Sequence, residues 1–375
     1  MSAKILFWLQ KFNKSLYFYE MKKGNYQVLG MMSGTSLDGI DLALCSFRIS
    51  EANQWSFAIE KAETLPYPTH WQARLKEAVH FSEGKLQSLN EEYTLYLAEV
   101  ISGFIERHSI KNLDAVCSHG HTILHQPNKG VTLQIGNLPI LAEKIQQTVV
   151  CDFRVQDVQL GGQGAPLVPM GDQLLFGHYD YCLNLGGFAN VSFEKQGKRM
   201  AYDICPVNIV MNHYAEKLGK AYDESGTFAR SGTINERLLE HLSALPFYSQ
   251  EPPKSLGLEW VLQCVFPLLE AANERPQNVL RTFVEHVAFQ LSKSFEENTS
   301  VLITGGGAYN PFLIERFMAQ KLLSVEIPGP LLIEYKEAMV FGLLGVLKLR
   351  GETNCLASVT GARQDHCSGQ KFKLI

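Results

Sequence analysis

The sequence predicts an α/β protein built from two similar halves, and three observations support this fold class. The chain has 375 residues, a length typical of two domains of ordinary size. Each half begins with a strand, a glycine loop and a second strand, around "GMMSGTSLDGID" in the first half and within "YCLNLGGFANVSFEK" in the second. Each half later contains a further strand that ends in glycine. This repeat of architecture, without repeated sequence, indicates a duplicated fold.

The other elements follow from hydrophobic periodicity and from turn residues. Residues 70–107 are predicted to be helical, and 114–122 to form a short strand that ends in a glycine loop. Residues 131–136 and 148–153 are predicted strands with a helix between them. The segment "DVQLGGQGAPLVP" is rich in glycine and proline, so it is either a linker or a loop between the halves.

Composition and charge exclude several classes of protein. The chain is 46% hydrophobic with a net charge of −4, which allows a sizeable core and argues against a nucleic-acid surface. No apolar run approaches the length that spans a bilayer, so no membrane association is expected. The eight cysteines include no CxxC pair and lie mostly in apolar runs, which is typical of buried thiols in a reducing cytoplasm. Residues 1–20 lack a signal-peptide cleavage site, and we expect them to lie outside the fold.

The first glycine loop, residues 34–41, has the residue types of an anion site. Its glycines allow close approach of a ligand to the backbone, and Thr35 and Ser36 offer hydroxyl and N–H donors. Asp38 and Asp41 could hold Mg²⁺, which prefers carboxylate and water oxygens. The alternative is an ordinary hairpin turn, for which Asp-Gly is a strong signal.

A second candidate anion site is the loop Gly305–Gly307, which follows an apolar strand. Asn310 can cap the next helix, and Pro311 suits the first position of that helix. A glycine loop that leads into a helix N-terminus favours a nucleotide or another anion. The alternative is tight packing of strand against helix, which also requires glycine.

Three histidines follow one another in "SHGHTILHQP". His119, His121 and His125 could begin a zinc site, although no matching ligand pattern occurs elsewhere in the chain. Two alternatives remain: Ser118, His119 and Gly120 touch a ligand, or the segment makes structural hydrogen bonds only.

Charged residues at strand ends are further candidates. Asp152 and Arg154 would face the same way on an extended chain, where Arg154 could clamp a carboxylate; a structural ion pair is the alternative. Asp203 ends a short run before Asn208, where a single carboxylate can serve as a general base or as a helix cap.

Taken together, these stretches resemble the anhydro-N-acetylmuramic acid kinase family. The resemblance covers residues 27–363 and rests on eight motifs in the family's order: "GMMSGTSLDGID", "SHGHT", "QIGN", "DFR", "GGQGAPLVP", "LNLGGFANVS", "TGGGAYNP" and "SVTGA". It implies the fold of actin, sugar kinases and Hsp70, with two ribonuclease-H-like domains and an ATP and substrate cleft between them. The expected division is an N-terminal extension at 1–26, a first domain at 27–155 plus 350–375, and a second domain at 156–349.

The resemblance also implies the activity and its cofactors. The expected reaction uses ATP and Mg²⁺ to hydrolyse the 1,6-anhydro ring of anhydro-N-acetylmuramic acid and to phosphorylate O6, a step in peptidoglycan recycling. The implied partner is a small-molecule sugar, and homodimerisation stays open. The rival interpretations are a kinase of another sugar and a nucleotide-dependent binding or scaffold protein.

Site residues can be carried over position by position. Asp203 matches the catalytic base of the family, and Asp38 and Asp41 stay the candidate ligands for the implied Mg²⁺. The implied sugar-side residues are Ser118, His119, Gln134, Asp152 and Arg154. The implied ATP-binding residues are Gly34, Thr35, Ser36, Leu37, Asp38, Gly39, Ile40, Asp41, Gly186, Gly187, Gly305, Gly306 and Gly307.

One motif departs from the family pattern. Around Asp203 the family commonly has "D-x-GPGN-x-L-x-D", whereas this chain has "DICPVNIVMN". Cys205 and Val207 replace two glycines, and Asn212 replaces an aspartate. A bulkier loop beside the base is therefore expected to narrow the water pocket or to shift Asp203.

Overall fold

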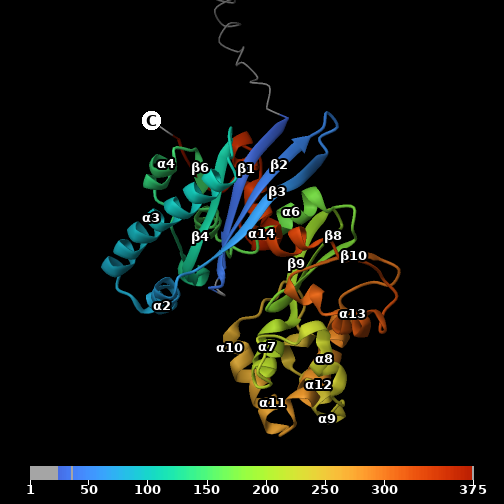
Figure 1. Cartoon of the computed structure of the whole chain (residues 1–375). Coiled ribbons are helices and arrows are strands. Elements are labelled where there is room, and N and C mark those ends of the chain that lie inside the picture. Colours follow the sequence, from blue (N-terminus) through green and yellow to red (C-terminus); the bar gives the residue numbers. More distant parts are fainter. Residues whose placement is uncertain (1–23, 35–36, 374–375) are drawn as a thin grey trace, which may run out of the picture.

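The computed structural model describes residues 24–34 and 37–373, and two β-sheets organise it (Figure 1). The predicted extension at 1–20 lies outside the described residues. The strands of the first sheet are β1 (Asn25–Ser33), β2 (Gly39–Ile49), β3 (Trp55–Pro66), β4 (Ala115–Gln126), β5 (Val131–Ile135), β6 (Val149–Cys151) and β12 (Gln370–Phe372). Because β1 already begins at Asn25, the predicted end of the extension at residue 26 is two residues too late.

The second sheet repeats the strand order of the first. Its strands are β7 (Tyr181–Leu185), β8 (Phe188–Lys195), β9 (Lys198–Pro206), β10 (Ser300–Thr304) and β11 (Ser324–Glu326). In both sheets an antiparallel three-strand meander continues from its first strand into parallel neighbours, with the orders β3-β2-β1-β4-β6 and β9-β8-β7-β10-β11. This shared topology confirms the predicted pair of ribonuclease-H-like units.

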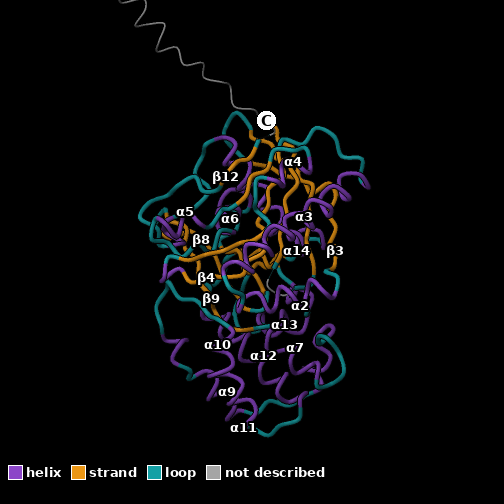
Figure 2. The backbone as a smooth tube through the Cα atoms, turned by 90° about the vertical axis from the view of Figure 1, so that its left-hand side faces the viewer, coloured by secondary structure: helices purple, strands orange, loops and turns teal. Residues whose placement is uncertain are grey.

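Helices connect and cover the strands. In the first half they are α2 (Thr69–Glu77), α3 (Glu83–Arg107), α4 (Ile140–Ile145), α5 (Val155–Gln159) and α6 (Val168–Leu175). The second half contains α7 (Asn208–Glu216), α8 (Thr227–Ser231), α9 (Glu236–Ser243), α10 (Leu258–Trp260), α11 (Phe266–Ala271), α12 (Pro276–Lys293) and α13 (Pro311–Met318). The chain ends with α14 (Pro330–Arg350) and α15 (Ala357–Thr360). Figure 2 shows the helices of the second half gathered at one end of the molecule.

Two sequence predictions need correction. The predicted helix at 70–107 is two helices, because the chain is extended at Phe81 and Ser82 between α2 and α3. The strand predicted to stop at a glycine loop continues to Gln126 as β4 and pairs with β5. Gly120 lies within this strand at φ +73, so it bends β4 without ending it.

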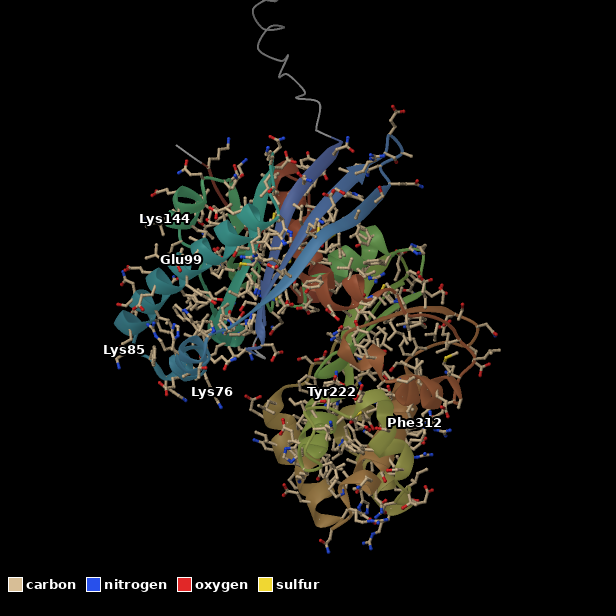
Figure 3. All side chains as sticks on the ribbon, in the orientation of Figure 1. Lys76, Lys85, Glu99, Lys144, Tyr222 and Phe312 are labelled. Carbon is tan, nitrogen blue, oxygen red and sulfur yellow. The ribbon has the colours of Figure 1, made fainter. Side chains whose placement is uncertain are left out.

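Helix α3 covers one face of the first sheet. Its buried side chains, Leu89, Tyr93, Leu97, Ile101 and Phe104, recur every three or four residues and therefore form one stripe against the sheet. Lys85 and Glu99 of α3 are exposed, as are Lys76 of α2 and Lys144 of α4 (Figure 3). Among the described residues, no helix is long and apolar enough to cross a membrane.

Helices α6 and α14 form a layer between the two sheets. One hydrophobic cluster combines Val28 of β1 and Cys182 of β7 with Met339 and Leu343 of α14. The approach is very close, since a Cβ on Gly30 would lie 1.9 Å from the Ala338 carbonyl oxygen. Because α14 packs mainly on β1, β2 and β4, we propose that residues 330–349 belong to the first unit rather than to the second.

A buried ionic cluster joins the middle layer to the second sheet. Asp172 of α6 lies 2.7 Å from Lys336 Nζ of α14, and it accepts a hydrogen bond from Ser192 of β8. Arg199 of β9 donates to Ser192 Oγ at 2.7 Å, and its guanidinium lies 3.9 Å from Asp172. All four residues are at most 5% exposed, so this cluster ties α6, α14, β8 and β9 together out of contact with water.

Candidate active site

Three segments of the second half meet at the carboxyl ends of its strands. Parallel strands β7 and β10 end at the same edge, which places the 186–187 loop beside Gly305–Gly307. The Val207 N–H donates to the Gly187 carbonyl at 2.8 Å, and Asn208 Nδ2 donates to the Leu185 carbonyl at 3.1 Å. The structure therefore brings together the two glycine loops and the segment that follows Asp203.

The position of Asp203 gives it the properties of a proton acceptor. It lies near the end of β9, where its Oδ2 accepts a hydrogen bond from the Leu256 N–H at 2.8 Å. Burial raises the pKa of Asp203, and the Leu256 N–H opposes this rise. A carboxylate with a raised pKa that still accepts a backbone hydrogen bond combines basicity with fixed orientation.

The two residues that replace family glycines point into the protein core. Cys205 and Val207 are both 0% exposed and belong to the main hydrophobic cluster of the second half. Their side chains therefore pack in the core of the second half, and the expected effect of the bulkier loop on Asp203 stays a prediction.

This packing predicts the effect of restoring the family glycine. Replacing Cys205 by Gly is expected to lower the free energy of unfolding by about 2 kcal/mol, because it leaves a cavity and loosens the strand backbone. Urea unfolding followed by circular dichroism measures the change. A variant as stable as the parent would contradict a packed role for Cys205.

The first loop is described in part. Thr35 and Ser36 lie outside the described residues, while the Leu37 N–H donates to the Gly34 carbonyl at 3.3 Å. Asp41 Oδ1 accepts from Thr64 Oγ1 at 2.6 Å. Burial raises the pKa of Asp41, Thr64 opposes the rise, and the carboxylates Asp38 and Glu334 add to it. This concentration of negative charge fits a divalent cation.

The first loop and the second glycine loop are linked through α14. Glu334, whose charge acts on Asp41, accepts a hydrogen bond from Tyr309 Oη at 2.9 Å. Tyr309 ends the short helix that follows Gly305. Loops from both halves are thus held next to the start of the same helix.

Arg154 is the centre of a second polar group. Its Nε donates to His119 Nε2 at 2.9 Å, and its Nη1 donates to the Gly164 carbonyl at 2.6 Å. Burial and the Arg154 charge hold the pKa of His119 well below its usual range, so the ring is neutral and its Nδ1–H donates to the Gly120 carbonyl. Burial also lowers the pKa of Arg154 to about 10, which leaves it cationic at neutral pH.

Asp152 does not share the direction of Arg154. The backbone turns at Asp152, where φ is +58, so the extended geometry predicted from sequence is wrong. Its carboxylate instead accepts from Gln370 Nε2 at 2.9 Å in β12. Burial raises the pKa of Asp152 to about 6, and the Gln370 amide opposes this rise.

The remaining predicted sugar-side residues make structural hydrogen bonds. Ser118 Oγ accepts from the Gly120 N–H at 3.1 Å, and Gln134 Nε2 donates to Thr132 Oγ1 at 2.9 Å. His121 Nδ1 lies 2.8 Å from Ser33 Oγ, and burial lowers its pKa to about 4. Within the described part of the chain, these histidines belong to no group of three or more side chains that could hold a metal ion.

The sequence analysis missed one carboxylate near Arg154. Glu337 of α14 is exposed, yet the surrounding protein raises its pKa, while the Arg154 charge opposes the rise. Asp41 adds to the increase. The signal in the sequence is an acidic residue directly before the apolar run 338–347 of a helix.

A cavity of about 490 Å³ lies elsewhere. It is lined by residues from the start of β1 and the end of β2, among them Tyr26 and Arg48. The glycine loop 34–41 is at the opposite end of these strands. Ligands of such sheets bind at the carboxyl ends of the parallel strands, so we do not assign this cavity to the active site.

Two α/β units of one topology, with glycine loops at the ends of their strands, form an arrangement suited to binding a nucleotide, and the relatives of the chain are phosphotransferases. The chain belongs to the anhydro-N-acetylmuramic acid kinase family, whose model matches residues 26–373. It is 34% identical to the Mannheimia succiniciproducens anhydro-N-acetylmuramic acid kinase over 92% of this chain and 98% of that protein. It is 32% identical to the protein of the same name from Haemophilus influenzae over 92% and 97%.

A solved structure with a similar arrangement is component A of the Acidaminococcus fermentans (R)-2-hydroxyglutaryl-CoA dehydratase. Its TM-score is 0.44 at 12% identity, with 87% of this chain and 99% of that chain covered. The assignment to the kinase family does not depend on this similarity.

Proposed function

We propose that this chain uses ATP to convert 1,6-anhydro-N-acetylmuramic acid and water into N-acetylmuramate 6-phosphate and ADP. The observation that carries the proposal is Asp203, a carboxylate with a raised pKa near the glycine loops at 186–187 and 305–307. Family membership supports the same substrate. The corresponding role is a step of peptidoglycan recycling in the cytoplasm.

In the proposed reaction Asp203 accepts a proton from the water that attacks the anomeric carbon. The bond from that carbon to O6 breaks, and O6 leaves with its electron pair. O6 then attacks the γ-phosphoryl group, and ADP leaves. Ring opening supplies the O6 nucleophile that the phosphoryl transfer consumes, so the position of Asp203 matters more than its basicity alone.

The negative charge on the transferred phosphoryl group must be stabilised by hydrogen-bond donors and by cations. The N–H groups of loops 34–41, 186–187 and 305–307 are the proposed phosphate contacts. Asp38 and Asp41 would hold Mg²⁺, which when bound neutralises charge on the phosphate oxygens. Glu334 adds to the negative charge around Asp41, so it would favour the same cation.

The sugar carries a carboxylate on its lactyl group, and this chemistry suits Arg154. Arg154 is held by His119 and Gly164, which pre-orients the guanidinium before a ligand arrives. Glu337 lies within the field of Arg154 and could accept a sugar hydroxyl. Asp152, Ser118 and Gln134 remain proposed substrate residues by family resemblance only.

The test is ADP release by the purified full-length chain with Mg-ATP and the anhydro sugar. Controls are a reaction without sugar and one with plain N-acetylmuramic acid, which has no ring to open. Release only with the anhydro sugar supports the proposal. ATP binding without sugar-dependent release would contradict it and would favour a nucleotide-dependent binding protein.

The Gly305 loop gives a separate prediction for the nucleotide. Gly305 has φ +83 and ψ 161, a region that only glycine adopts readily, and a Cβ there would lie 2.6 Å from Asn184 Oδ1. Replacing Gly305 by Ala is expected to weaken ATP binding about 10-fold or more. Isothermal titration measures the change, with Gly84→Ala as control because a Cβ at that position meets no neighbour within 4 Å. Equal affinity in the Gly305 variant would exclude this loop from the nucleotide site.

A further inference from the structure

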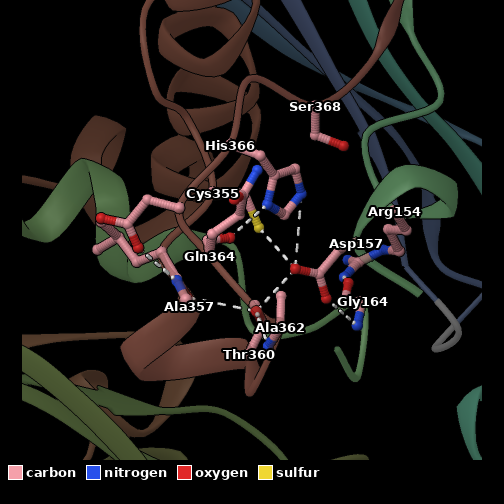
Figure 4. Close-up of polar contacts among 12 residues, drawn as sticks. Arg154, Asp157, Gly164, Cys355, Ala357, Thr360, Ala362, Gln364, His366 and Ser368 are labelled. Atoms are coloured by element: carbon pink, nitrogen blue, oxygen red, sulfur yellow. Dashed lines mark hydrogen bonds and ion pairs between the residues drawn. The ribbon is translucent and has the colours of Figure 1, made fainter. Parts of the chain in front are cut away.

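A buried cluster of three different metal-ligating side chains lies where the C-terminal segment meets α5 (Figure 4). Its members are Asp157 of α5, Cys355 and His366, which are 0%, 1% and 6% exposed. One oxygen from Asp157, the Cys355 sulfur and one His366 nitrogen all lie within 4.8 Å of one another. The chemistry proposed above uses none of these three residues.

The backbone fixes two of the three side chains. Cys355 and His366 form an antiparallel bridge, in which each N–H donates to the carbonyl of the other residue at 3.1 Å. Residues paired in this way carry their side chains on the same side. Neighbouring Asn354 holds the same turn by hydrogen bonds to the Leu344 and Ser368 carbonyls.

The hydrogen bonds of His366 show which ring nitrogen is available. Nδ1 lies 3.1 Å from the Gln364 carbonyl, an acceptor, so Nδ1 carries a proton. In the neutral ring Nε2 then presents its lone pair. Nε2 is buried, makes no hydrogen bond, and faces Asp157 Oδ1 at 3.6 Å. A metal ion between the Nε2 lone pair and the Oδ1 oxygen would satisfy both acceptors.

The distances and charges suit a metal ion. Two ligand atoms bound at about 2.0–2.1 Å in tetrahedral geometry lie about 3.4 Å apart, close to the 3.6 Å observed between Nε2 and Oδ1. Cys355 Sγ lies 3.1 Å from the same oxygen and donates its proton to it. With the thiol deprotonated, one thiolate and one carboxylate balance a divalent cation, so the buried site is neutral.

We propose that Asp157, Cys355 and His366 bind one Zn²⁺ ion. Zn²⁺ matches this set of one sulfur, one nitrogen and one oxygen ligand better than Mg²⁺ or Ca²⁺, which prefer oxygen alone. Binding replaces the Sγ–H bond by a sulfur–zinc bond and releases the proton to solvent. The fourth position is open to water or to Thr360 Oγ1, which lies 2.7 Å from Asp157 Oδ1.

The ion would link the C-terminal segment, which carries Cys355 and His366, to the loop around Gly164 that supports Arg154. Asp157 Oδ2 accepts from the Gly164 N–H at 2.7 Å, and the Gly164 carbonyl accepts from Arg154. The role of the site is therefore structural. The ion would hold the Asp157 carboxylate in place, and this carboxylate holds the loop that contains Gly164. The ion itself takes no part in the chemistry.

The test is the metal content of the full-length chain purified from zinc-supplemented medium and dialysed against metal-free buffer. We expect one equivalent of Zn²⁺ in the parent and less than about one tenth of an equivalent in Cys355→Ser and in His366→Gln. Cys367→Ser is the matched control, because Cys367 is adjacent and more accessible but lies outside the cluster. It should retain the ion.

Cobalt provides a second measurement that does not depend on whether the variants fold. The parent chain refolded with Co²⁺ should show a thiolate-to-cobalt charge-transfer band in the near ultraviolet. Zn²⁺ at about 100 times its Kd should raise the Tm of the metal-free parent by about 5 °C. A parent chain without zinc and without the cobalt band overturns the proposal. Retention of full zinc content by Cys355→Ser and His366→Gln also overturns it.

Discussion

Replacing Asp203 by Asn is expected to lower sugar-dependent ADP release by about 10²–10⁴-fold. The amide keeps the shape of the side chain and can still accept the Leu256 N–H hydrogen bond, but it cannot take a proton from water. ATP affinity should stay within about twofold, because Asp203 is not among the proposed phosphate contacts.

Steady-state kinetics and isothermal titration of the same preparation separate these two quantities. Asp180→Asn is a suitable control: Asp180 precedes β7 at the opposite end from the glycine loops, and its carboxylate accepts hydrogen bonds from the N–H and the Oγ of Ser300. That variant should keep full turnover. If Asp203→Asn also turned over normally, Asp203 would not be the base.

The pH dependence of turnover follows from the same carboxylate. Burial raises the pKa of Asp203, and the base must be deprotonated, so activity should fall as pH falls through a pKa above the ordinary aspartate value. A pKa that is higher in the folded than in the unfolded state means that folding disfavours the ionised carboxylate. Ionised Asp203 therefore lowers the stability of the folded protein at pH values above that pKa. Asp203→Asn should therefore raise the Tm at neutral pH while it lowers activity by about 10²–10⁴-fold, a combination that simple misfolding cannot produce.

Local patterns in the sequence were sufficient to predict the hairpins and glycine loops. The segments on both sides of Gly34 and Gly186 either alternate polar and apolar residues or stop at a glycine. Both features depend only on residues that are close in the sequence. Helix α14 was not predicted because it is apolar on nearly all sides, with buried residues from Ile333 to Leu347 and no stripe of period 3.6. From Ala338 to Leu347 every residue of this helix is buried, so this part has no solvent-exposed face from which periodicity could arise.

The side-chain partners of the site were harder to predict, because they depend on contacts far apart in the chain. The interaction of Arg154 with Glu337 crosses 183 positions, and its hydrogen bond to His119 crosses 35. The turn at Asp152 is a backbone conformation that its own sequence does not favour. Asp203 was predicted at a strand end and lies near the end of β9, but only the core packing of Cys205 showed where the substituted side chain points.

The middle layer gives the largest predicted effect on stability. Replacing Lys336 by Met is expected to lower the free energy of unfolding by about 3–5 kcal/mol. Met fills similar space but removes the ammonium group 2.7 Å from Asp172, a carboxylate that is only 4% exposed. Ser192 and the more distant Arg199 guanidinium at 3.9 Å cannot replace this direct contact.

Urea unfolding measures the loss, and Lys76→Met provides the control because Lys76 is exposed on α2 and should change stability by less than about 0.5 kcal/mol. A double-mutant cycle of Lys336→Met with Asp172→Asn isolates the interaction energy of this pair, because Arg199 stays in the cluster in every variant. If Lys336→Met changed the free energy of unfolding by less than about 0.5 kcal/mol, the contact between Lys336 and Asp172 would add nothing to stability. Because Asp172 connects α14 to β8 and β9, losing Lys336 should also separate the unfolding of the two sheets into distinct transitions.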